Sequence, residues 1–236
     1  MYLLLVTFLC ITCISANLPC KISDHECTKK AAASSYSRWF EILKESLEPL
    51  HKDLIEGNFP TLNYKFLDTN TTGFSQCSVE DLKFSGDKVK DNLKFDLKMF
   101  CPRLMMKGNY ELKGVLISES VVGKGPYTME CKGYTFVVNA DMNTHPGPDG
   151  KEVATIKSFK VDVESAKGMQ FDFKNLFNGQ KELSDAVHKF ANENWEAVSK
   201  AFQGPFMTAN FETMIKIVNN KILKHIPLDT YIDSKV

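Results

Sequence analysis

The side chains that could carry chemistry in this sequence are few and widely spaced. The five histidines stand at positions 25, 51, 145, 188 and 225, and none has a nucleophile or second ligand at a catalytic or metal-binding spacing. The sequence contains no G-x-S-x-G elbow, no phosphate-binding loop and no H-E-x-x-H motif. Gly123-Lys124-Gly125 lacks a third glycine and precedes Pro126, which indicates a connection between strands. These observations predict a protein that is not an enzyme and that uses no metal and no cofactor.

Cysteine is the second reactive residue type, and its possible pairings come next. Cys10 and Cys13 fall in an apolar N-terminal run, which leaves an odd set of five: Cys20, Cys27, Cys77, Cys101 and Cys131. In an oxidising compartment an odd set implies an unpaired thiol or a bridge to another chain. Cys20 and Cys27 are close in sequence and flank a helix start, so we expect them to pair. All pairings among the other three stay open, and none of the five has the C-x-x-C spacing of a metal site.

The N-terminus indicates the compartment. Residues 1–14 carry no charge and are mostly apolar, and Ser15 and Ala16 follow. This pattern is typical of a signal peptide, because the run is shorter than the ~20 residues of a membrane anchor. We expect a signal peptide over residues 1–16, a single domain over residues 17–236, and a secreted, extracellular protein without a stable membrane anchor. Asn70 begins a glycosylation sequon in a polar stretch that we expect to be exposed.

The charge balance excludes two classes of partner. The 29 basic and 29 acidic residues give a formal net charge of zero, whereas nucleic-acid binding requires clustered lysine and arginine. The sequence has no block of like charges, so an acidic membrane surface is not expected as a target. With 43% hydrophobic residues, the composition is that of an ordinary globular domain.

Hydrophobic periodicity predicts the elements. Ser23 and Glu26 have the spacing of a helix capping box, and Pro49 ends a helical pattern whose apolar face comprises Tyr36, Phe40, Leu43 and Leu47. About residues 60–177, apolar and polar residues alternate in several runs separated by turn signals. Such strands form an antiparallel sheet with one solvated face, so another element must cover the inner face.

The last third of the chain supplies that cover. After the Asn178-Gly179 turn, an apolar stripe at helical spacing continues to Ile222, with an expected kink or break at Gly204-Pro205. Roughly 40 residues of helix would reach about 60 Å, so the helix must lie along the sheet. A short N-terminal helix, antiparallel strands and a long C-terminal helix together predict an α+β fold.

Several motifs then occur in a recognisable order. LFNGQKEL begins at Leu176 and NENW ends at Trp195. Weaker matches are PCK at 19–21, LEPL at 47–50, GKG at 123–125 and IPLD at 226–229. Over about residues 19–232 the chain resembles the takeout and juvenile hormone binding protein family of insects, within the tubular lipid-binding superfamily.

The resemblance implies a strongly curved antiparallel sheet wrapped around the long helix. It also implies an internal apolar tunnel that carries juvenile hormone, a related terpenoid or a fatty-acid-like lipid. Contacts would come from inward-facing residues, with Tyr127, Thr128 or Tyr134 as a polar anchor. The candidates are Phe95, Met99, Met129, Phe136, Phe171, Phe190, Trp195, Val198, Phe202 and Met214. Apolar periodicity shows only that a side chain faces inward, so ordinary core packing is the alternative for each of them.

Two other functions stay open at this point. The same fold with a filled interior would be an extracellular protein-interaction factor, whose partner is a receptor or another extracellular protein. A secreted esterase acting on a lipid would need an activated serine or cysteine, and the sequence indicates none.

Overall fold

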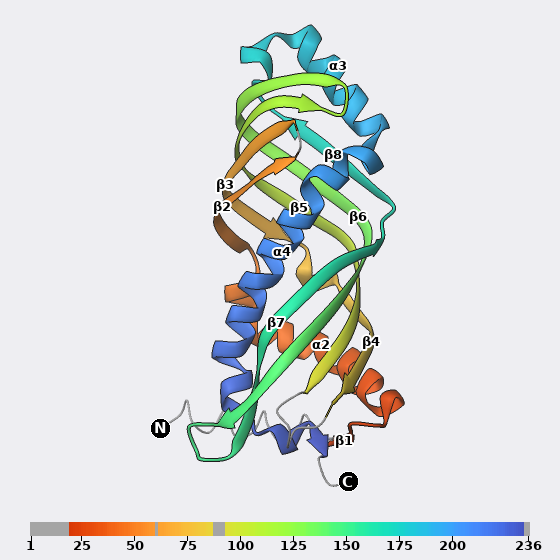
Figure 1. The fold of residues 1–236 in the computed structure, drawn as a ribbon, viewed down its shortest axis with the longest axis vertical. Coiled ribbons are helices and arrows are strands. Elements are labelled where there is room, and N and C mark those ends of the chain that lie inside the picture. The colour runs from red at the N-terminus through yellow and green to blue at the C-terminus, as the bar shows by residue number, and fades with distance from the viewer. Residues whose placement is uncertain (1–18, 60, 87–92, 234–236) are drawn as a thin grey trace.

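The chain folds as a long, twisted antiparallel sheet with a helix running along its inner face (Figure 1). The structure is a computed structural model that describes residues 19–59, 61–86 and 93–233; the expected signal peptide lies outside them. The helices are α2 (His25–Leu47), α3 (Lys181–Glu193) and α4 (Trp195–Lys221). The strands are β1 (Cys20–Lys21), β2 (Leu50–Phe59), β3 (Leu62–Thr72), β4 (Ser78–Ser85), β5 (Lys94–Leu116), β6 (Glu119–Pro146), β7 (Glu152–Ser165), β8 (Gly168–Phe173) and β9 (Ile232–Asp233).

Strands β5 and β6 form the spine of the sheet, since they pair with each other along 94–116 and 119–141. At one end of this spine, β3 and β2 flank β5 and β8 flanks β6. At the other end, β4 flanks β5 and β7 flanks β6. We call these parts the α3-end half and the α2-end half, because α3 lies beyond the first and α2 packs against β4 in the second (Figure 1).

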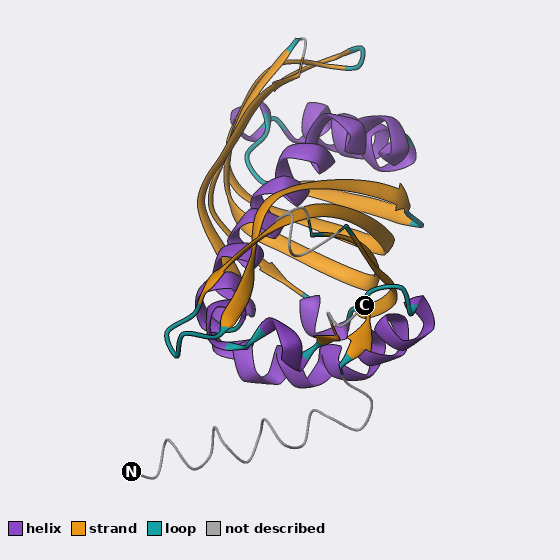
Figure 2. Cartoon of the chain, turned by 60° about the horizontal axis from the view of Figure 1, so that its bottom comes forward, coloured by secondary structure: helices purple, strands orange, loops and turns teal. Residues whose placement is uncertain are grey.

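The sheet curves around one side of helix α4 (Figure 2). The helix packs against β2 near one edge of the sheet and against β7 and β8 near the other. One side of the helix carries an exposed stripe of Ala197, Lys200, Gly204, Thr208 and Glu212. The buried residues are Val198, Ser199, Ala201, Phe202, Phe206, Met207, Ala209, Asn210 and Phe211. The predicted α+β fold is confirmed, with its long C-terminal helix and curved antiparallel sheet.

Of the kink or break expected at Gly204-Pro205, the break is wrong, because α4 continues through Pro205. A proline inside a helix removes the N–H that would bond to the carbonyl four residues earlier, here that of Ala201. The Tyr64 hydroxyl of β3 donates to this carbonyl oxygen at 3.4 Å. The interruption lies instead at Asn194, whose φ of −109° and ψ of 33° separate α3 from α4.

Three further sequence predictions need correction. The helix cap is Asp24 rather than Ser23, since the Asp24 carboxylate accepts the Cys27 N–H at 3.0 Å. Strand β2 lies before the predicted strand region, and its alternation of buried and exposed residues changes phase between Asp53 and Leu54. The 123–125 segment lies within β6 rather than between strands. A Cβ atom at Gly123 would lie 2.9 Å from the Tyr110 hydroxyl, so glycine permits this close packing.

Two disulfides lie in the α2-end half. Cys20 bonds to Cys27, the pair that the sequence favoured, and Cys77 bonds to Cys101. The first bridge adjoins a two-stranded parallel sheet of β1 and β9, which brings the start and end of the described chain together. Cys131 is buried with a free thiol.

Asparagine side chains hold the helices to free sheet edges. Asn219 of α4 accepts the Ile156 N–H of β7 at 2.9 Å and donates to the Ile156 carbonyl at 2.9 Å. Asn192 of α3 makes the same pair of bonds with Phe171 of β8, at 2.8 and 3.2 Å. Each amide therefore substitutes for a strand neighbour, which satisfies edge groups that would otherwise lack partners.

We predict that Asn219→Ala lowers the free energy of unfolding by about 1–3 kcal/mol, because both Ile156 backbone groups lose their partner. Asn220→Ala is the matched control: the Asn220 side chain accepts a bond from the exposed Lys224, and we expect a loss below about 0.5 kcal/mol. Urea unfolding measures both variants. An equal loss of unfolding free energy in both variants would show that the Asn219 bonds to Ile156 do not stabilise the fold.

We also predict that Tyr64→Phe lowers the free energy of unfolding by about 1 kcal/mol, because the Ala201 carbonyl then has no partner. In a Pro205→Ala background, residue 205 regains its N–H and supplies that partner, so the same Tyr64 change should cost less. A double-mutant cycle in urea measures the difference. Additive effects would show that the two residues are not coupled through this carbonyl.

Candidate functional site

The interior of the α3-end half is filled by an aromatic cluster. We define this cluster as Tyr64, Phe66, Tyr110, Tyr127, Phe171, Phe173, Phe202 and Phe206, which form a connected set of ring contacts. Phe66 is fully buried at its centre, with its ring centroid 4.6 Å from that of Phe206 and 4.8 Å from that of Tyr127. Rings at these distances leave no room for a guest molecule between them.

A small apolar void lies between the cluster and α3. Its volume is about 20 Å³, room for about one water molecule. Its lining combines the ends of β5, β6 and β8 with helix residues: Leu112, Leu116, Val121, Phe171, Phe173, Leu176, Val187, His188, Ala191, Val198 and Phe202. The His188 Nε2 atom accepts the Phe173 N–H at 2.8 Å, so this ring fastens α3 to β8.

The α2-end half is different, because several inward-facing apolar side chains there stay partly exposed. We define the inner strip as Leu82, Phe84, Leu97, Phe159, Val161 and Val163. The register shows that these residues face inward. Phe84 pairs with the buried Phe95, and Val161 pairs with the buried Val138. Water therefore reaches the concave face here, whereas the inward residues of the α3-end half are buried.

The helices of this half also carry half-buried apolar residues that pack against the core. On the C-terminal part of α4 these are Met214, Ile217 and Val218, and on α2 they are Tyr36 and Trp39. The α2 helix is fixed in place by the Thr28 hydroxyl, which donates to the Leu82 carbonyl at 2.7 Å. The interior of this half is thus apolar on both its sheet and helix sides.

The structure separates the predicted contact residues into two groups. Phe95, Met99 and Phe136 are buried in the α2-end half, beside the inner strip, and Met214 is half-buried on α4. The others lie in the α3-end half or at the α3–α4 junction: Met129, Phe171, Phe190, Trp195, Val198 and Phe202. Phe171 and Phe202 belong to the aromatic cluster. In this half these residues therefore pack as ordinary core residues.

The candidate polar anchors also separate. Thr128, one of the three alternatives, pairs with Asp172 and lies on the outer face of the sheet. The Tyr127 hydroxyl bonds to Thr69 Oγ1 at 2.7 Å, and the Tyr134 hydroxyl lies 3.6 Å from the Met169 sulfur. Burial raises the pKa of both tyrosines, which keeps them as neutral hydroxyls. Sequence reasoning missed Thr71, a buried hydroxyl to which the described residues supply no hydrogen-bond partner. In the sequence, Thr71 stood out only as part of the glycosylation sequon.

Asn70 does not lie in the loop that a sequon suggests. It belongs to β3 and pairs with His51 of β2. Its side chain is partly exposed and lies 3.1 Å from the His51 Nδ1 atom. A glycan at Asn70 would therefore project from the outer face of the sheet, and glycosylation there stays a prediction.

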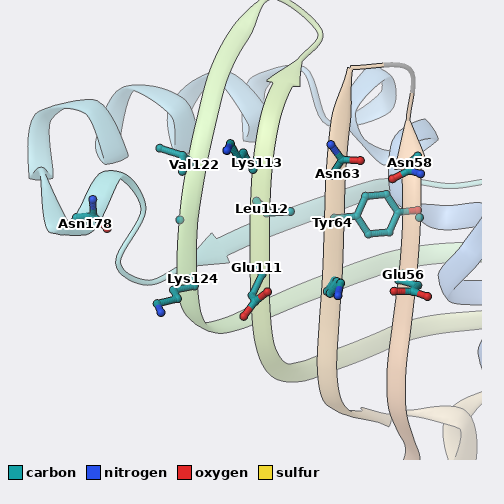
Figure 3. Close-up of a pocket in the computed structure, with 13 residues that line it drawn as sticks. Glu56, Asn58, Asn63, Tyr64, Glu111, Leu112, Lys113, Val122, Lys124 and Asn178 are labelled. Carbon is teal, nitrogen blue, oxygen red and sulfur yellow. The ribbon is translucent and has the colours of Figure 1, made fainter.

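A larger hollow of about 690 Å³ lies across the strands of the α3-end half (Figure 3). Its walls are two rows of exposed side chains in direct cross-strand register: Glu56, Lys65, Glu111 and Lys124, and then Asn58, Asn63, Lys113 and Val122. Charges alternate in sign along the first row, which favours this strand register. Covering these charges with an apolar guest would cost their solvation, so the hollow does not suit such a ligand.

The described residues show little else that could do chemistry. Among them, no three or more histidine, cysteine, aspartate or glutamate side chains come together as a possible metal site. Within the same ranges, no helix combines the length and apolar character needed to span a bilayer.

Sequence comparison then identifies the family. Residues 3–233 match the family model described as haemolymph juvenile hormone binding protein. The chain belongs to this family. A curated relative, the circadian clock-controlled protein daywake of Drosophila melanogaster, is 25% identical over 227 residues, covering 92% of this chain and 86% of that protein. Daywake of Drosophila yakuba is 23% identical over 224 residues, covering 90% and 85%.

A solved structure shares the fold. Takeout 1 of Epiphyas postvittana superposes with a TM-score of 0.81 at 21% sequence identity, covering 91% of this chain and 99% of that one. The resemblance to takeout proteins, found from the motifs at Leu176 and Trp195, is thereby confirmed. At this identity the match establishes the fold, while the contents of the interior depend on this chain's own side chains.

The free thiol gives a test of the cysteine assignment. Burial raises the pKa of the Cys131 thiol to about 12, so at pH 8 its thiolate fraction falls about a thousandfold below that of an ordinary cysteine. We expect a chain beginning at Asn17 to resist iodoacetamide when native and to take one label in denaturant, measured by mass spectrometry. Rapid labelling of the native chain, or two labels after unfolding, would contradict the assignment.

Proposed function

We propose that this protein is a non-enzymatic carrier that binds a small hydrophobic molecule at the inner strip of its α2-end half. The observation that carries the proposal is the partial exposure of inward-facing apolar side chains there, on a concave face covered by α2 and α4. A fold that only needed a core would bury these residues, as it does in the other half.

The physical chemistry of this surface favours an apolar ligand. Covering exposed apolar area releases about 25 cal/mol per Å², and the inner strip offers Phe84 and Phe159 among its larger side chains. An interior with apolar walls and few polar groups is typical of small-molecule sites.

Family membership supports the choice of ligand class. We propose juvenile hormone, a related terpenoid or a fatty-acid-like lipid as the guest, on the strength of the family's description. Two disulfides fit an oxidising compartment. Together with the apolar N-terminal run, they support the proposal that the protein is secreted and works outside the cell.

The filled aromatic cluster is the observation that favours the second candidate, an extracellular protein-interaction factor. A protein of this kind would need no guest, and its interior would serve stability alone. The two candidates differ in one measurable property, which is whether the isolated protein binds an apolar small molecule with one-to-one stoichiometry.

We predict that Val161→Glu weakens binding of a fluorescent apolar probe, of juvenile hormone and of lauric acid by at least tenfold, because a carboxylate on the inner strip would be desolvated by the guest. The matched control is Val137→Glu, on the neighbouring strand. Val137 is also half-buried, but it faces outward opposite Asp162. We expect this control to bind like the unaltered protein.

Fluorescence titration with competition by each lipid measures these affinities, and urea unfolding shows that both variants are folded. Absence of binding by the unaltered protein would refute the carrier function and favour the protein-interaction candidate. Equal weakening by both substitutions would place the guest somewhere other than the inner strip.

A further inference from the structure

Helix α3 is attached to the rest of the molecule over a small surface. It lies at the pole opposite the chain ends (Figure 1) and packs mainly against β8. Of its 13 residues, Val187 and Ala191 are the two that are buried. Non-helical backbone bounds the helix on both sides, at Gln180 (φ −69°, ψ 100°) and at Asn194. The helix can therefore move as a unit when its bonds to β8 are lost.

Two side chains one turn apart on α3 bond to the edge of β8. Asn192 bonds to both backbone groups of Phe171, and His188 Nε2 accepts the Phe173 N–H at 2.8 Å. The other ring nitrogen of His188, Nδ1, lies 2.8 Å from the Ser184 carbonyl oxygen. A carbonyl oxygen only accepts, so Nδ1 carries the hydrogen and Nε2 carries the lone pair. These two bonds therefore require His188 to be the neutral Nδ1–H tautomer.

Protonation of His188 is incompatible with its bond to Phe173. An imidazolium carries a hydrogen on both ring nitrogens, so Nε2 would then present an N–H to the Phe173 N–H, which would lose its acceptor. Among the described residues that line the small void, His188 is also the only one with a titratable side chain. A positive charge there would lie beside apolar walls. Uptake of a proton therefore favours a state in which α3 has left β8.

Charged groups on the neighbouring elements do not offset this effect. Those on α3 and β8 are exposed and already form ion pairs with each other: Lys181 with Asp185, Lys189 with Glu193, and Asp172 with Lys174. Helix α4 contributes Glu196 in its first turn, and this side chain is exposed as well. The attraction of exposed carboxylates for an imidazolium is weak, because water screens it.

Two other histidines respond to acid in the opposite direction. His25 Nε2 lies 2.5 Å from an Asp81 carboxylate oxygen, and His51 Nε2 lies 3.0 Å from one of Asp53. Protonation of either ring strengthens its contact, because the hydrogen bond becomes charged on both sides. Acid therefore tightens the contact between α2 and β4 that His25 makes, while it removes the contact between α3 and β8 that His188 makes.

We propose that His188 is a pH-sensitive contact that holds α3 on β8 at neutral pH and releases it in acid. A histidine in water takes up a proton near pH 6.5, so release is favoured about tenfold more for each pH unit below that value. Between pH 7.5 and pH 5.0, the ratio of released to docked α3 should rise about thirtyfold. This inference is independent of the proposed carrier function, because the inner strip lies in the other half of the molecule.

The test is hydrogen exchange of the Phe173 amide, followed by NMR at pH 7.5 and pH 5.0 on the chain beginning at Asn17. Protection factors, corrected for the intrinsic exchange rate at each pH, report the ratio of released to docked α3. In the unaltered protein, protection of the Phe173 amide should be at least tenfold lower at pH 5.0. Protection of amides along the paired β5 and β6 should change less than threefold, which separates release of α3 from general acid unfolding.

Two variants identify the titrating group. In His188→Gln, the side-chain oxygen can still accept the Phe173 N–H but takes up no proton, so protection at the two pH values should agree within threefold. Asn192→Ala removes the neighbouring bonds to β8 and leaves His188 in place. Its protection should therefore be lower at both pH values, while the ratio between them stays at tenfold or more.

The ratio of protection factors decides the outcome. A change of less than threefold in the unaltered protein would refute the proposal. A tenfold ratio that persists in His188→Gln would also refute it, because another group would then carry the response. If the glutamine loosens α3 at pH 7.5, the ratio remains decisive, since residue 188 no longer titrates in that variant.

Discussion

A long helix lying in the concave face of the sheet is the constraint on which this structure depends. On its buried side, a backbone group that loses its partner cannot rely on water to replace it. Pro205 creates that problem in the middle of α4, and the Tyr64 hydroxyl solves it at the Ala201 carbonyl. Tyr64 reaches this position over Gly57, where a Cβ atom would lie 2.3 Å from the Tyr64 hydroxyl oxygen. One helix defect is thus matched by residues on two strands.

The same helix requires the sheet to close around it. The side-chain amides of Asn219 and Asn192 bond to the free edges of β7 and β8. The sheet therefore curves without leaving these backbone groups unsatisfied.

In the α3-end half, the aromatic rings around Phe66 fill the interior. In the α2-end half the inner strip keeps part of its exposure, although the inward-facing Phe95, Met99 and Phe136 are buried there too.

The two hydrophobic periods in the sequence were enough to predict the order of elements and the α+β fold. They could not predict which inward residues would stay accessible. Leu97 and Met99 alternate with polar neighbours in the same way, yet Met99 is 2% exposed and Leu97 is half-buried. Periodicity also could not predict where the helix is interrupted. Helix α4 continues through Pro205 with the Tyr64 hydroxyl bonded to the Ala201 carbonyl, and Tyr64 lies on a strand far away in sequence. Both features depend on tertiary packing, which periodicity does not encode.

The short parallel pairing of β1 with β9 has a practical consequence for how the molecule can be handled. Cys20 lies opposite Ile232, so both ends of the described chain emerge from one pole, beside α2 (Figure 1). A label, resin or fusion partner attached at either terminus would leave the opposite pole, with α3, facing solution. The fold can therefore be immobilised in a single orientation from either end, with the Cys20–Cys27 bridge tying the attachment point to the first turn of α2.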